Sequence, residues 1–374
     1  MKVLNLGCSG FVGSHLTGRL LEEGHTVFGV DVYRDKIEEF LKHKSMNFIE
    51  QDIRSLRFHL DELVEESDLV IDLIAYANPG LYVRMPLEVF RLNFTENLKI
   101  AEACVRYNKR LIQFSSCEVY GKTVVNLVKD ELSDPDDPQY AIFSEDKSDF
   151  ILGHVGKHRW IYACSKQLLE RIIHAYGIEQ GFNYTIIRPF NFIGPKIDYL
   201  LEETDGIPRV FSFFMDALIS GKPMKLVDGG HHRRCYTYID DAIECIYRIV
   251  DNHDNVCDRQ IFNIGTPKNE VSMRELAIMM REIYVEKIMT KKPASLPEIV
   301  EVSSEDFYGE GYEDSDRRIP DISKAHSLLR WKPKWKLRDL LEITMRYYVT
   351  DYIEYYRKQC KPDKFSHNVF RKIL

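Results

Sequence analysis

The sequence predicts an α/β fold in which a doubly wound parallel sheet is followed by a smaller C-terminal α/β lobe. Three observations favour it. Strands and helices alternate over roughly the first 190 of the 374 residues, the interior strands are continuous apolar runs, and a glycine-rich turn follows the first strand. Continuous apolar runs are typical of parallel strands covered on both faces, and the alternation favours right-handed crossovers. The predicted architecture is a Rossmann-type domain with a second lobe over its strand ends.

The first unit along the chain is a strand, a turn, a helix and a second strand. The apolar strand Val3–Leu6 leads into a glycine-rich turn at residues 7–13, and an amphipathic helix follows over Ser14–Leu21. A second buried strand then spans Thr26–Asp31. In this βαβ context a glycine pattern indicates a dinucleotide site rather than a plain turn between strand and helix.

Three glycines of this turn have separate expected roles. Gly7 permits the tight turn, Gly10 lets the backbone approach a pyrophosphate, and Gly13 lets the helix pack closely on the strand. Phe11 and Val12 lie between the last two glycines and are expected to contact the same ligand.

The acidic residue at the end of the second strand indicates which cofactor binds. Asp31 is expected to accept hydrogen bonds from the adenine ribose, and its charge would repel a 2′-phosphate, so NAD is favoured over NADP. Arg34 and Lys36 are close enough along the chain to leave NADP open. Asp52, which follows the strand Asn47–Ile49, is expected to contact the adenine.

The rest of the first domain continues the alternation of strands and helices. Further apolar strands are predicted at Asp68–Ile74, Arg110–Ser115 and Tyr184–Arg188, with helices around 86–107 and 162–176. The segment 133–148 is rich in Asp, Pro and Ser and predicts a surface excursion.

After Pro195 the pattern changes to short helices and strands, with helices predicted at Val210–Ile219, Asp240–Val250 and Ser272–Ile288. We therefore divide the chain into a dinucleotide-binding domain at 1–190, a region at 191–360 that is mainly a substrate-binding lobe, and a basic tail at 361–374.

Tyr162 and Lys166 are the residues that carry the expected chemistry. They lie four residues apart, about 150 residues after the glycine turn, so that phenol and ammonium share one face of a helix. A nearby ammonium stabilises phenolate and lowers the pKa of a tyrosine from about 10 toward neutrality. The pair predicts a base that takes a proton from a sugar hydroxyl while the carbon loses hydride. The alternative is an ordinary helix surface.

Composition argues against several other classes of protein. The net charge is −7 and no basic run stands out, so nucleic acid and anionic membranes are not expected partners. No apolar stretch of about 18 residues is present, so a membrane-spanning helix is not expected. The first strand follows Met1 directly, so a signal peptide is not expected either. The eight cysteines contain no C-x-x-C pair, which predicts reduced thiols, a cytoplasmic location and no zinc site. His231 and His232 have no ligand-spaced acidic or cysteine partners, so a solvated or phosphate-facing loop is favoured over a metal site.

The order of three motifs resembles that of the extended short-chain dehydrogenase/reductases that act on nucleotide sugars. These motifs are Gly7-x-x-Gly10-x-x-Gly13, Tyr162-x-x-x-Lys166 and Arg188-Pro189-Phe190-Asn191-x-x-Gly194-Pro195. Within this family the chain is most similar to the UDP-glucuronate decarboxylases, including those that also make UDP-apiose. The segments that carry this narrower resemblance are Ser116–Gly121, Arg159-Trp160-x-Tyr162, Lys225–Gly230, Tyr312 and Asp316–Pro320. The resemblance implies NAD as cofactor, a UDP-sugar as substrate and a homodimer.

The resemblance also implies roles for individual residues. Tyr162 and Lys166 would oxidise carbon 4 of UDP-glucuronate, and Glu118 and Arg318 would act near carbon 5 as carbon dioxide leaves. The remaining implied residues are Ser116 and Cys117 at the catalytic centre, Ile74 and Ala75 at the cofactor, and Ala77, Tyr82, Ser116, Cys117 and Tyr312 at the substrate. Arg159, Asn191, Lys225 and Arg234 are also implied at the substrate, where they would hold its diphosphate. The alternatives without a catalytic role are a solvated acid at a strand end for Glu118 and a surface ion pair with Asp314 or Asp316 for Arg318.

Two positions and the final step leave alternatives open. Most of these decarboxylases have Ser where this chain has Cys117, whereas the apiose-forming synthase has Cys there as well. That synthase is also expected to have a second cysteine, at the position where this chain has Ala77. Plain decarboxylation is therefore favoured over ring contraction. The product would be UDP-xylose if the ketone is reduced, or the UDP-4-keto-pentose if it leaves first. A UDP-sugar 4-epimerase or dehydratase and a non-catalytic NAD-binding regulator are the rival functions.

Overall fold

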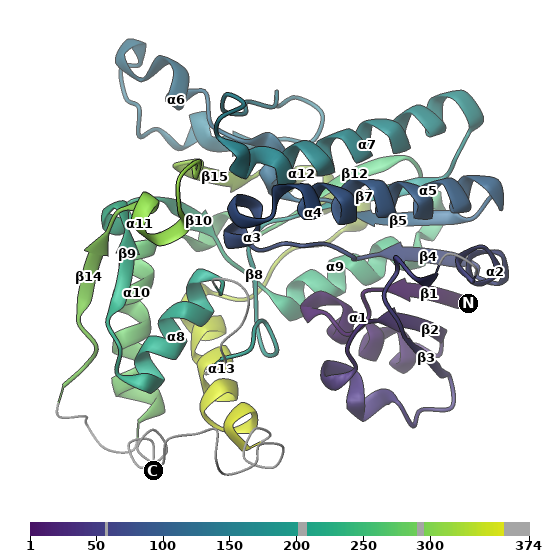
Figure 1. The fold of residues 1–374 in the computed structure, drawn as a ribbon, viewed down its shortest axis with the longest axis horizontal. Coiled ribbons are helices and arrows are strands. Elements are labelled where there is room, and N and C mark those ends of the chain that lie inside the picture. Colours follow the sequence, from purple (N-terminus) through teal and green to yellow (C-terminus); the bar gives the residue numbers. More distant parts are fainter. Residues whose placement is uncertain (57–58, 201–207, 290–294, 355–374) are drawn as a thin grey trace.

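The computed structural model describes residues 1–56, 59–200, 208–289 and 295–354 (Figure 1). The strands are β1 (Lys2–Leu6), β2 (Thr26–Asp31), β3 (Met46–Glu50), β4 (Leu69–Asp72), β5 (Arg110–Phe114), β6 (Ile142–Phe143), β7 (Tyr184–Pro189), β8 (Phe192–Ile193), β9 (Met224–Val227), β10 (Arg233–Cys235), β11 (Thr237–Tyr238), β12 (Gln260–Ile264), β13 (Glu270–Ser272), β14 (Ile299–Val302) and β15 (Arg317–Pro320). The α-helices are α1 (Phe11–Glu22), α2 (Leu60–Glu66), α3 (Pro79–Arg84), α4 (Pro86–Phe90), α5 (Asn97–Arg106), α6 (Val125–Val128), α7 (Ile161–Gln180), α8 (Val210–Ser220), α9 (Ile239–Asp251), α10 (Met273–Ile283), α11 (Ser304–Tyr308), α12 (Ser323–Leu329) and α13 (Leu337–Val349).

A seven-stranded sheet forms the centre of the first domain. Its strand order is β12-β7-β5-β4-β1-β2-β3, and every neighbouring pair is parallel. The chain moves outward from β1 first to β2 and β3 and then, in the other direction, to β4 and β5. Ligands of doubly wound sheets bind at this switch point, beyond the carboxyl ends of the strands. The predicted fold class is confirmed.

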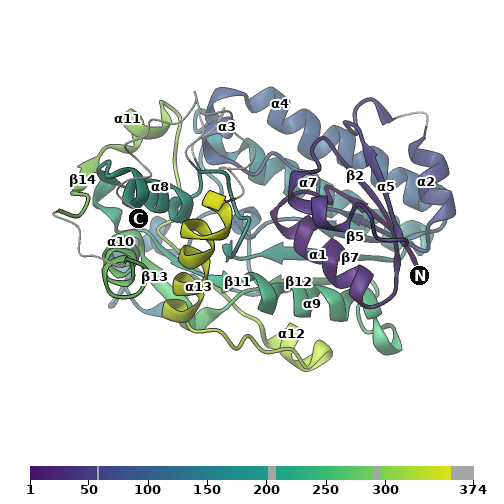
Figure 2. The same cartoon turned by 90° about the horizontal axis from the view of Figure 1, so that it is seen from below.

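Helices cover both faces of this sheet. Figures 1 and 2 show α1 and α9 on one face and α4, α5 and α7 on the other. Val3 of β1 belongs to the same buried cluster as Leu16 of α1, whereas its neighbour Leu4 belongs to the cluster that contains Ile100 of α5. Successive side chains of a strand point to opposite faces, and here both faces are buried. This explains why the interior strands are continuous apolar runs rather than alternating ones.

The two long helical regions of the first domain have the predicted positions. The region predicted at 86–107 consists of α4, a π-helical turn over Arg91–Glu96, and α5. Helix α7 begins beside the predicted start and extends past the predicted end to Gln180, where Gly181 in a left-handed conformation (φ 68°) terminates it. Figure 1 shows α4, α5 and α7 side by side on the outer face of the sheet.

The seventh strand of the central sheet comes from a part of the chain beyond residue 190. β12 pairs with β7, with Ile261 opposite Ile186, and α9 packs against α1. Residues 239–264 therefore extend the central sheet and its helix layer, although the sequence division placed them in the region that is mainly the second lobe. The strand was not predicted because Gln260 and Asn263 interrupt its apolar run.

The second lobe contains a small mixed sheet, a two-stranded sheet and several helices. The mixed sheet has the order β13-β10-β15-β6, β9 pairs with β14, and α8, α10 and α13 pack around them (Figure 1). The predicted surface excursion at 133–148 contributes β6, which pairs with β15. The predicted tail at 361–374 lies outside the described residues. No helix in the described part of the chain is long and apolar enough to span a membrane.

Candidate active site

A cavity of about 450 Å³ lies between the carboxyl ends of the central strands and the second lobe. Most of the residues predicted for the cofactor and substrate sites line it. These are Gly7, Gly10, Phe11, Val12, Gly13, Ala75, Ala77, Tyr82, Ser116, Cys117, Glu118, Arg159, Tyr162, Lys166, Asn191, Lys225, Arg234, Tyr312 and Arg318. Asp31, Asp52 and Ile74 are not among the lining residues. Residues from both ends of the chain are thus brought to one site.

The glycine turn has the backbone geometry that a dinucleotide requires. Gly7 adopts φ +84°, and a Cβ at Gly13 would lie 2.0 Å from the carbonyl oxygen of Gly7. A side chain at either position would therefore force the turn and the helix apart. Gly10 caps α1 without a side-chain hydrogen bond, and the first turn of that helix holds no acidic residue. Its open N–H groups and the helix dipole fit a pyrophosphate.

The two acidic residues predicted at the adenosine end have different surroundings. Asp31 accepts hydrogen bonds from the backbone N–H groups of Ser9 (2.8 Å) and Val32 (2.7 Å), so that its carboxylate joins the glycine turn to the end of β2. Asp52 forms an ion pair with Arg54, with an N–O distance of 2.6 Å. The adenine contact of Asp52 and the ribose contact of Asp31 stay predictions.

Tyr162 and Lys166 both point into the interior from the first turns of α7. Tyr162 is 4% exposed, and its ring stacks on that of Tyr82 with the ring centres 4.5 Å apart. Lys166 is 2% exposed, and its Nζ donates hydrogen bonds to the carbonyl oxygen of Phe114 (3.0 Å) and to Asn97 Oδ1 (3.4 Å). Tyr162 therefore faces the cavity, whereas Lys166 is anchored to the end of β5.

The predicted direction of the Tyr162 pKa is wrong in this structure. Burial, together with the nearby carboxylate of Glu118, raises the pKa of Tyr162 above its ordinary value, although a hydrogen bond with Ser116 acts in the opposite direction. Burial also lowers the pKa of Lys166, to about 8. The sequence argument counted the ammonium but not the desolvation of the phenolate, which is the largest effect on the pKa of Tyr162 here.

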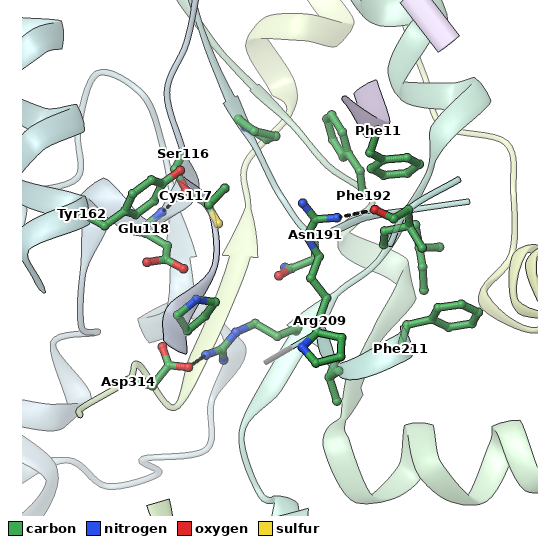
Figure 3. A pocket seen from close by; sticks show the side chains of 18 of the residues that line it. Phe11, Ser116, Cys117, Glu118, Tyr162, Asn191, Phe192, Arg209, Phe211 and Asp314 are labelled. Atoms are coloured by element: carbon green, nitrogen blue, oxygen red, sulfur yellow. Dashed lines mark hydrogen bonds and ion pairs between the residues drawn. The ribbon is translucent and has the colours of Figure 1, made fainter. Parts of the chain in front are cut away.

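The segment after β5 forms a tight turn that presents Ser116, Cys117 and Glu118 to the cavity. Ser116 Oγ accepts a hydrogen bond from the Glu118 N–H (3.1 Å) and caps the short 3₁₀ helix Cys117–Tyr120. Glu118 forms an ion pair with Arg159 at 2.8 Å, so it is not the solvated strand-end acid of the alternative interpretation. Figure 3 shows Tyr162, Ser116, Cys117 and Glu118 together on one side of the cavity.

A partly buried carboxylate that the sequence did not place in the site joins three arginines. Asp314 Oδ1 contacts Arg318 (2.7 Å) and Arg159 (3.3 Å), and Asp314 Oδ2 contacts Arg234 (2.8 Å). Figure 3 shows Asp314 at the edge of the cavity. Burial works against the charge of Asp314, but the three guanidinium groups hold its pKa well below the usual range. The alternative interpretation of Arg318 was a surface ion pair with Asp314 or Asp316. Arg318 does pair with Asp314, but it is only 2% exposed, so the pair does not lie on the surface.

The cluster also connects Arg318 with the thiol of the neighbouring turn. Arg318 Nη1 lies 3.7 Å from Cys117 Sγ. Burial raises the pKa of Cys117, and the Arg318 charge opposes this increase. The two carboxylates of this cluster, Glu118 and Asp314, face three guanidinium groups, those of Arg159, Arg234 and Arg318. The cluster therefore has a net positive charge, which suits an anionic ligand.

The residues predicted to hold the diphosphate have contacts within the protein. Arg159 and Arg234 use their guanidinium groups on the carboxylates described above. Asn191 adopts φ +42° and its Nδ2 donates to the carbonyl oxygen of Cys235 at 3.2 Å. Lys225 is exposed on β9 and lines the cavity. Their roles toward a diphosphate stay predictions.

The opposite side of the cavity contains residues that sequence reasoning missed. Figure 3 shows Phe192, Arg209 and Phe211 there, beside the predicted Phe11. Arg209 donates a hydrogen bond to the carbonyl oxygen of Ile197 (3.0 Å) and pairs with Asp198 (3.0 Å). Phe192 is an unspecified position inside the Arg188–Pro195 motif, whereas Arg209 and Phe211 follow that motif, where nothing in the local pattern signals a site.

The predicted tyrosine of the late segment belongs to the same wall as Asp314. Tyr312 stacks on Tyr308 with ring centres 4.0 Å apart and donates a hydrogen bond to Asp314 Oδ2 (3.2 Å). His232 contacts Asp316 at 3.4 Å. Within the described residues, no group of three or more His, Cys, Asp or Glu side chains has an arrangement that could hold a metal ion.

Comparison with known proteins places this arrangement in a family. The chain is 41% identical over 371 residues to UDP-D-apiose/UDP-D-xylose synthase 1 of Arabidopsis thaliana, covering 96% of this chain and 94% of that protein. It is 41% identical over 369 residues to the UDP-D-apiose/UDP-D-xylose synthase of Oryza sativa subsp. japonica, covering 96% and 92%. The crystal structure of the PbgP3 protein from Burkholderia pseudomallei matches with a TM-score of 0.79 and 36% identity, covering 93% of this chain and 96% of that one.

The family profile covers the glycine turn, the Tyr162–Lys166 pair and the central sheet up to its last strand. It matches residues 3–265, and its description names NAD as the cofactor on which the family depends. The glycine turn described above fits that cofactor, and the predicted family resemblance is confirmed. The chain belongs to the NAD dependent epimerase/dehydratase family.

Proposed function

We propose that the protein oxidises carbon 4 of UDP-glucuronate with NAD and then releases the sugar carboxylate as carbon dioxide. One observation carries this proposal. A single cavity joins the glycine turn, the Tyr162 phenol and a largely buried cluster of Glu118, Arg318 and Asp314. The names of the curated relatives, which are synthases of UDP-apiose and UDP-xylose, support a UDP-sugar substrate that ends as a pentose.

The first stage, the oxidation of carbon 4, depends on the transfer of one proton to the phenol oxygen of Tyr162. Tyr162 Oη would take the proton of the carbon 4 hydroxyl, while the Ser116 hydroxyl supports the phenolate by hydrogen bonding. NAD, when bound, supplies the acceptor for the hydride of carbon 4 and can return it in a last step. Because burial raises the pKa of Tyr162, its deprotonation depends on the cations around the site.

The second stage depends on the buried cluster. The 4-ketone is β to the carboxylate at carbon 5, so the carbon–carbon bond can break with its electron pair moving into an enolate. Arg318 would stabilise the developing negative charge. Carbon 5 of the enolate must then take up one proton in place of the carboxylate, and Glu118, held by Arg159 at 2.8 Å, would transfer that proton from solvent. Asp314 would keep three guanidinium groups oriented toward the cavity.

The experiment combines the purified protein, NAD and UDP-glucuronate, and follows the mass of the nucleotide sugar and the absorbance of NADH. The proposal predicts a product that is lighter by carbon dioxide. A stoichiometric rise of NADH would identify the UDP-4-keto-pentose as the released product, and catalytic NAD without accumulating NADH would identify UDP-xylose. A nucleotide sugar of unchanged mass would reject decarboxylation.

Formation of UDP-apiose is a second candidate because of Cys117. This buried thiol lines the cavity beside Arg318, and the curated relatives are named for both apiose and xylose products. Ala77, which also lines the cavity, offers no second thiol. We therefore expect pentose without ring contraction from the natural chain. Chromatographic separation of apiose from xylose after hydrolysis of the product distinguishes the two outcomes.

A further inference from the structure

A buried carboxylate in the central sheet, near Lys166 of the Tyr162–Lys166 pair, belongs to none of the motifs. Asp72 is the last residue of β4, which lies between β1 and β5, and its side chain has 0% exposure. A carboxylate in the interior is costly unless a charge or hydrogen bonds compensate it. The surroundings of Asp72 therefore indicate what its charge is for.

A short polar path connects Asp72 with Lys166. Asp72 is opposite Gln113 in the pairing of β4 with β5, and Gln113 Nε2 donates to Asp72 Oδ2 at 2.9 Å. The same amide nitrogen lies 3.4 Å from the carbonyl oxygen of Phe114. Lys166 Nζ donates to that carbonyl oxygen at 3.0 Å. The carboxylate and the ammonium thus lie at the two ends of one hydrogen-bonded path through the interior.

The other acidic residue near Lys166 is already neutralised. Glu170 lies one turn further along α7, and both of its carboxylate oxygens are bound by Arg188, at 3.0 and 2.6 Å. Both side chains of this pair are buried. A bidentate guanidinium cancels most of the field that a carboxylate exerts on its neighbours. Glu170 is therefore a weak counter-ion for Lys166.

Asp72, in contrast, has only neutral hydrogen-bond donors. Besides Gln113, the backbone N–H of Ile74 donates a hydrogen bond to Asp72 Oδ1 at 3.0 Å. No Lys, Arg or His among the described residues forms an ion pair with the Asp72 carboxylate. Cys104 of α5 also faces Asp72, but burial raises the pKa of that thiol and keeps it neutral. Lys166 is the cation that acts on Asp72, and it opposes the rise that burial causes in the pKa of Asp72.

We propose that Asp72 is a positioning residue whose carboxylate is the buried counter-ion that keeps Lys166 in its ammonium form beside Tyr162. Burial lowers the pKa of Lys166 to about 8 against the opposing effects of Asp72 and Glu170. Without Asp72 the ammonium would lose its proton at a lower pH. An uncharged amine cannot favour the Tyr162 phenolate, which burial already disfavours. The catalytic part of this inference rests on the proposed function, whereas the charge state of Lys166 does not.

The first test is the variant Asp72→Asn, which removes the charge and keeps the shape. Gln113 Oε1 is buried and has no partner, so a rotated Gln113 amide can accept a hydrogen bond from the new asparagine. Nuclear magnetic resonance of isotope-labelled lysine side chains reports the titration of Lys166, and Lys166→Met identifies its signal. We expect the titration to move about one pH unit lower in Asp72→Asn.

A second variant tests whether the charge itself is responsible. Asn97 Nδ2 is buried without a partner, and Asn97 Oδ1 lies 3.4 Å from Lys166 Nζ. The double variant Asp72→Asn with Asn97→Asp moves the carboxylate from β4 to α5, where it lies next to Lys166, and should return the Lys166 titration toward that of the natural chain. The matched control is Asp68→Asn, outside the site, where the carboxylate accepts a hydrogen bond from the Lys2 N–H at 2.7 Å. It should leave the titration unchanged.

The pH profile of turnover gives a readout that a structural defect would not reproduce. Asp72→Asn should lose activity on the alkaline side of the profile and recover it as the pH falls, whereas a folding defect lowers activity at every pH. An unmoved Lys166 titration in Asp72→Asn would overturn the inference for any substrate. A shifted titration in a protein that leaves UDP-glucuronate unchanged would reject the proposed function and keep the role of Asp72.

Discussion

At the scale of single residues, the proposed oxidation depends on the phenol oxygen of Tyr162. Replacing Tyr162 with Phe keeps the ring that stacks on Tyr82 but removes the group that transfers the proton. We expect turnover to fall about a hundredfold to ten-thousandfold, because that is the usual contribution of a positioned acid–base group. NAD binding, measured by calorimetry, should stay close to that of the natural protein. Tyr176→Phe on the same helix is the control, and normal turnover of Tyr162→Phe would contradict the assignment.

Arg318 separates decarboxylation from oxidation. Arg318→Met keeps an unbranched, largely buried side chain and removes the charge that the enolate requires. We expect carbon dioxide release to fall at least about a hundredfold, on the order of 3 kcal/mol of transition-state stabilisation, while NADH absorbance can still appear. The neighbouring Arg317 pairs with Glu270 instead of the cavity carboxylates, so Arg317→Met is a matched control. Normal carbon dioxide release by Arg318→Met would favour a 4-epimerase or dehydratase.

Single residues also show where sequence reasoning stopped. Tyr162, Glu118 and Arg318 were found because each belongs to a motif, and the fold brings all three to one cavity. Asp314 was missed as a site residue because an acidic stretch, here with Glu313 and Asp316, is usually a solvated surface. Its burial follows from the long-range contact with Arg234, on a strand that pairs with β15. No local pattern contains that information.

At the scale of elements, helix α7 is fixed to the sheet by a buried ion pair. Glu170 of α7 and Arg188 of β7 form two hydrogen bonds, and Arg188 also donates to the Tyr120 hydroxyl at 2.8 Å. Glu170→Gln leaves the buried guanidinium without its charge partner, which typically costs about 3–5 kcal/mol. We expect a clear decrease in the urea concentration at the unfolding midpoint. Glu179→Gln, at an exposed position of α7, should change it little, and equal midpoints for the two variants would refute this role.

Elements were predictable where they are buried on both faces and unpredictable where they depend on distant partners. The strands β1, β2, β4, β5 and β7 are apolar runs, and their existence could be predicted from the sequence alone. β12 could not, because Asn263 interrupts it to bind the carbonyl oxygens of Phe143 (3.0 Å) and Asp321 (3.2 Å). β6 is two residues long and exists through its pairing with β15. Such strands are specified by tertiary contacts rather than by periodicity.

At the scale of the whole molecule, the outer face of α4 and α7 predicts a homodimer. Leu87 (66% exposed), Leu168 (43%) and Ile178 (71%) leave apolar surface on these helices. We propose that α4, α5 and α7 pair with their counterparts in a second chain. Light scattering at micromolar concentration should give about twice the 43.9 kDa of one chain, and Leu168→Arg should give monomers. Leu328→Arg, on α12, is the control for an added charge at an exposed leucine. A monomeric natural chain would contradict this assembly.

The fate of the substrate carboxylate tests the central claim most directly. UDP-glucuronate labelled at its carboxyl carbon is incubated with the natural protein and NAD, and the label is measured both as carbon dioxide and in the nucleotide sugar. Our account predicts that the label leaves as carbon dioxide in proportion to the pentose formed, and that Tyr162→Phe blocks both signals. Label that stays in the sugar while UDP-galacturonate accumulates would contradict it and identify a 4-epimerase.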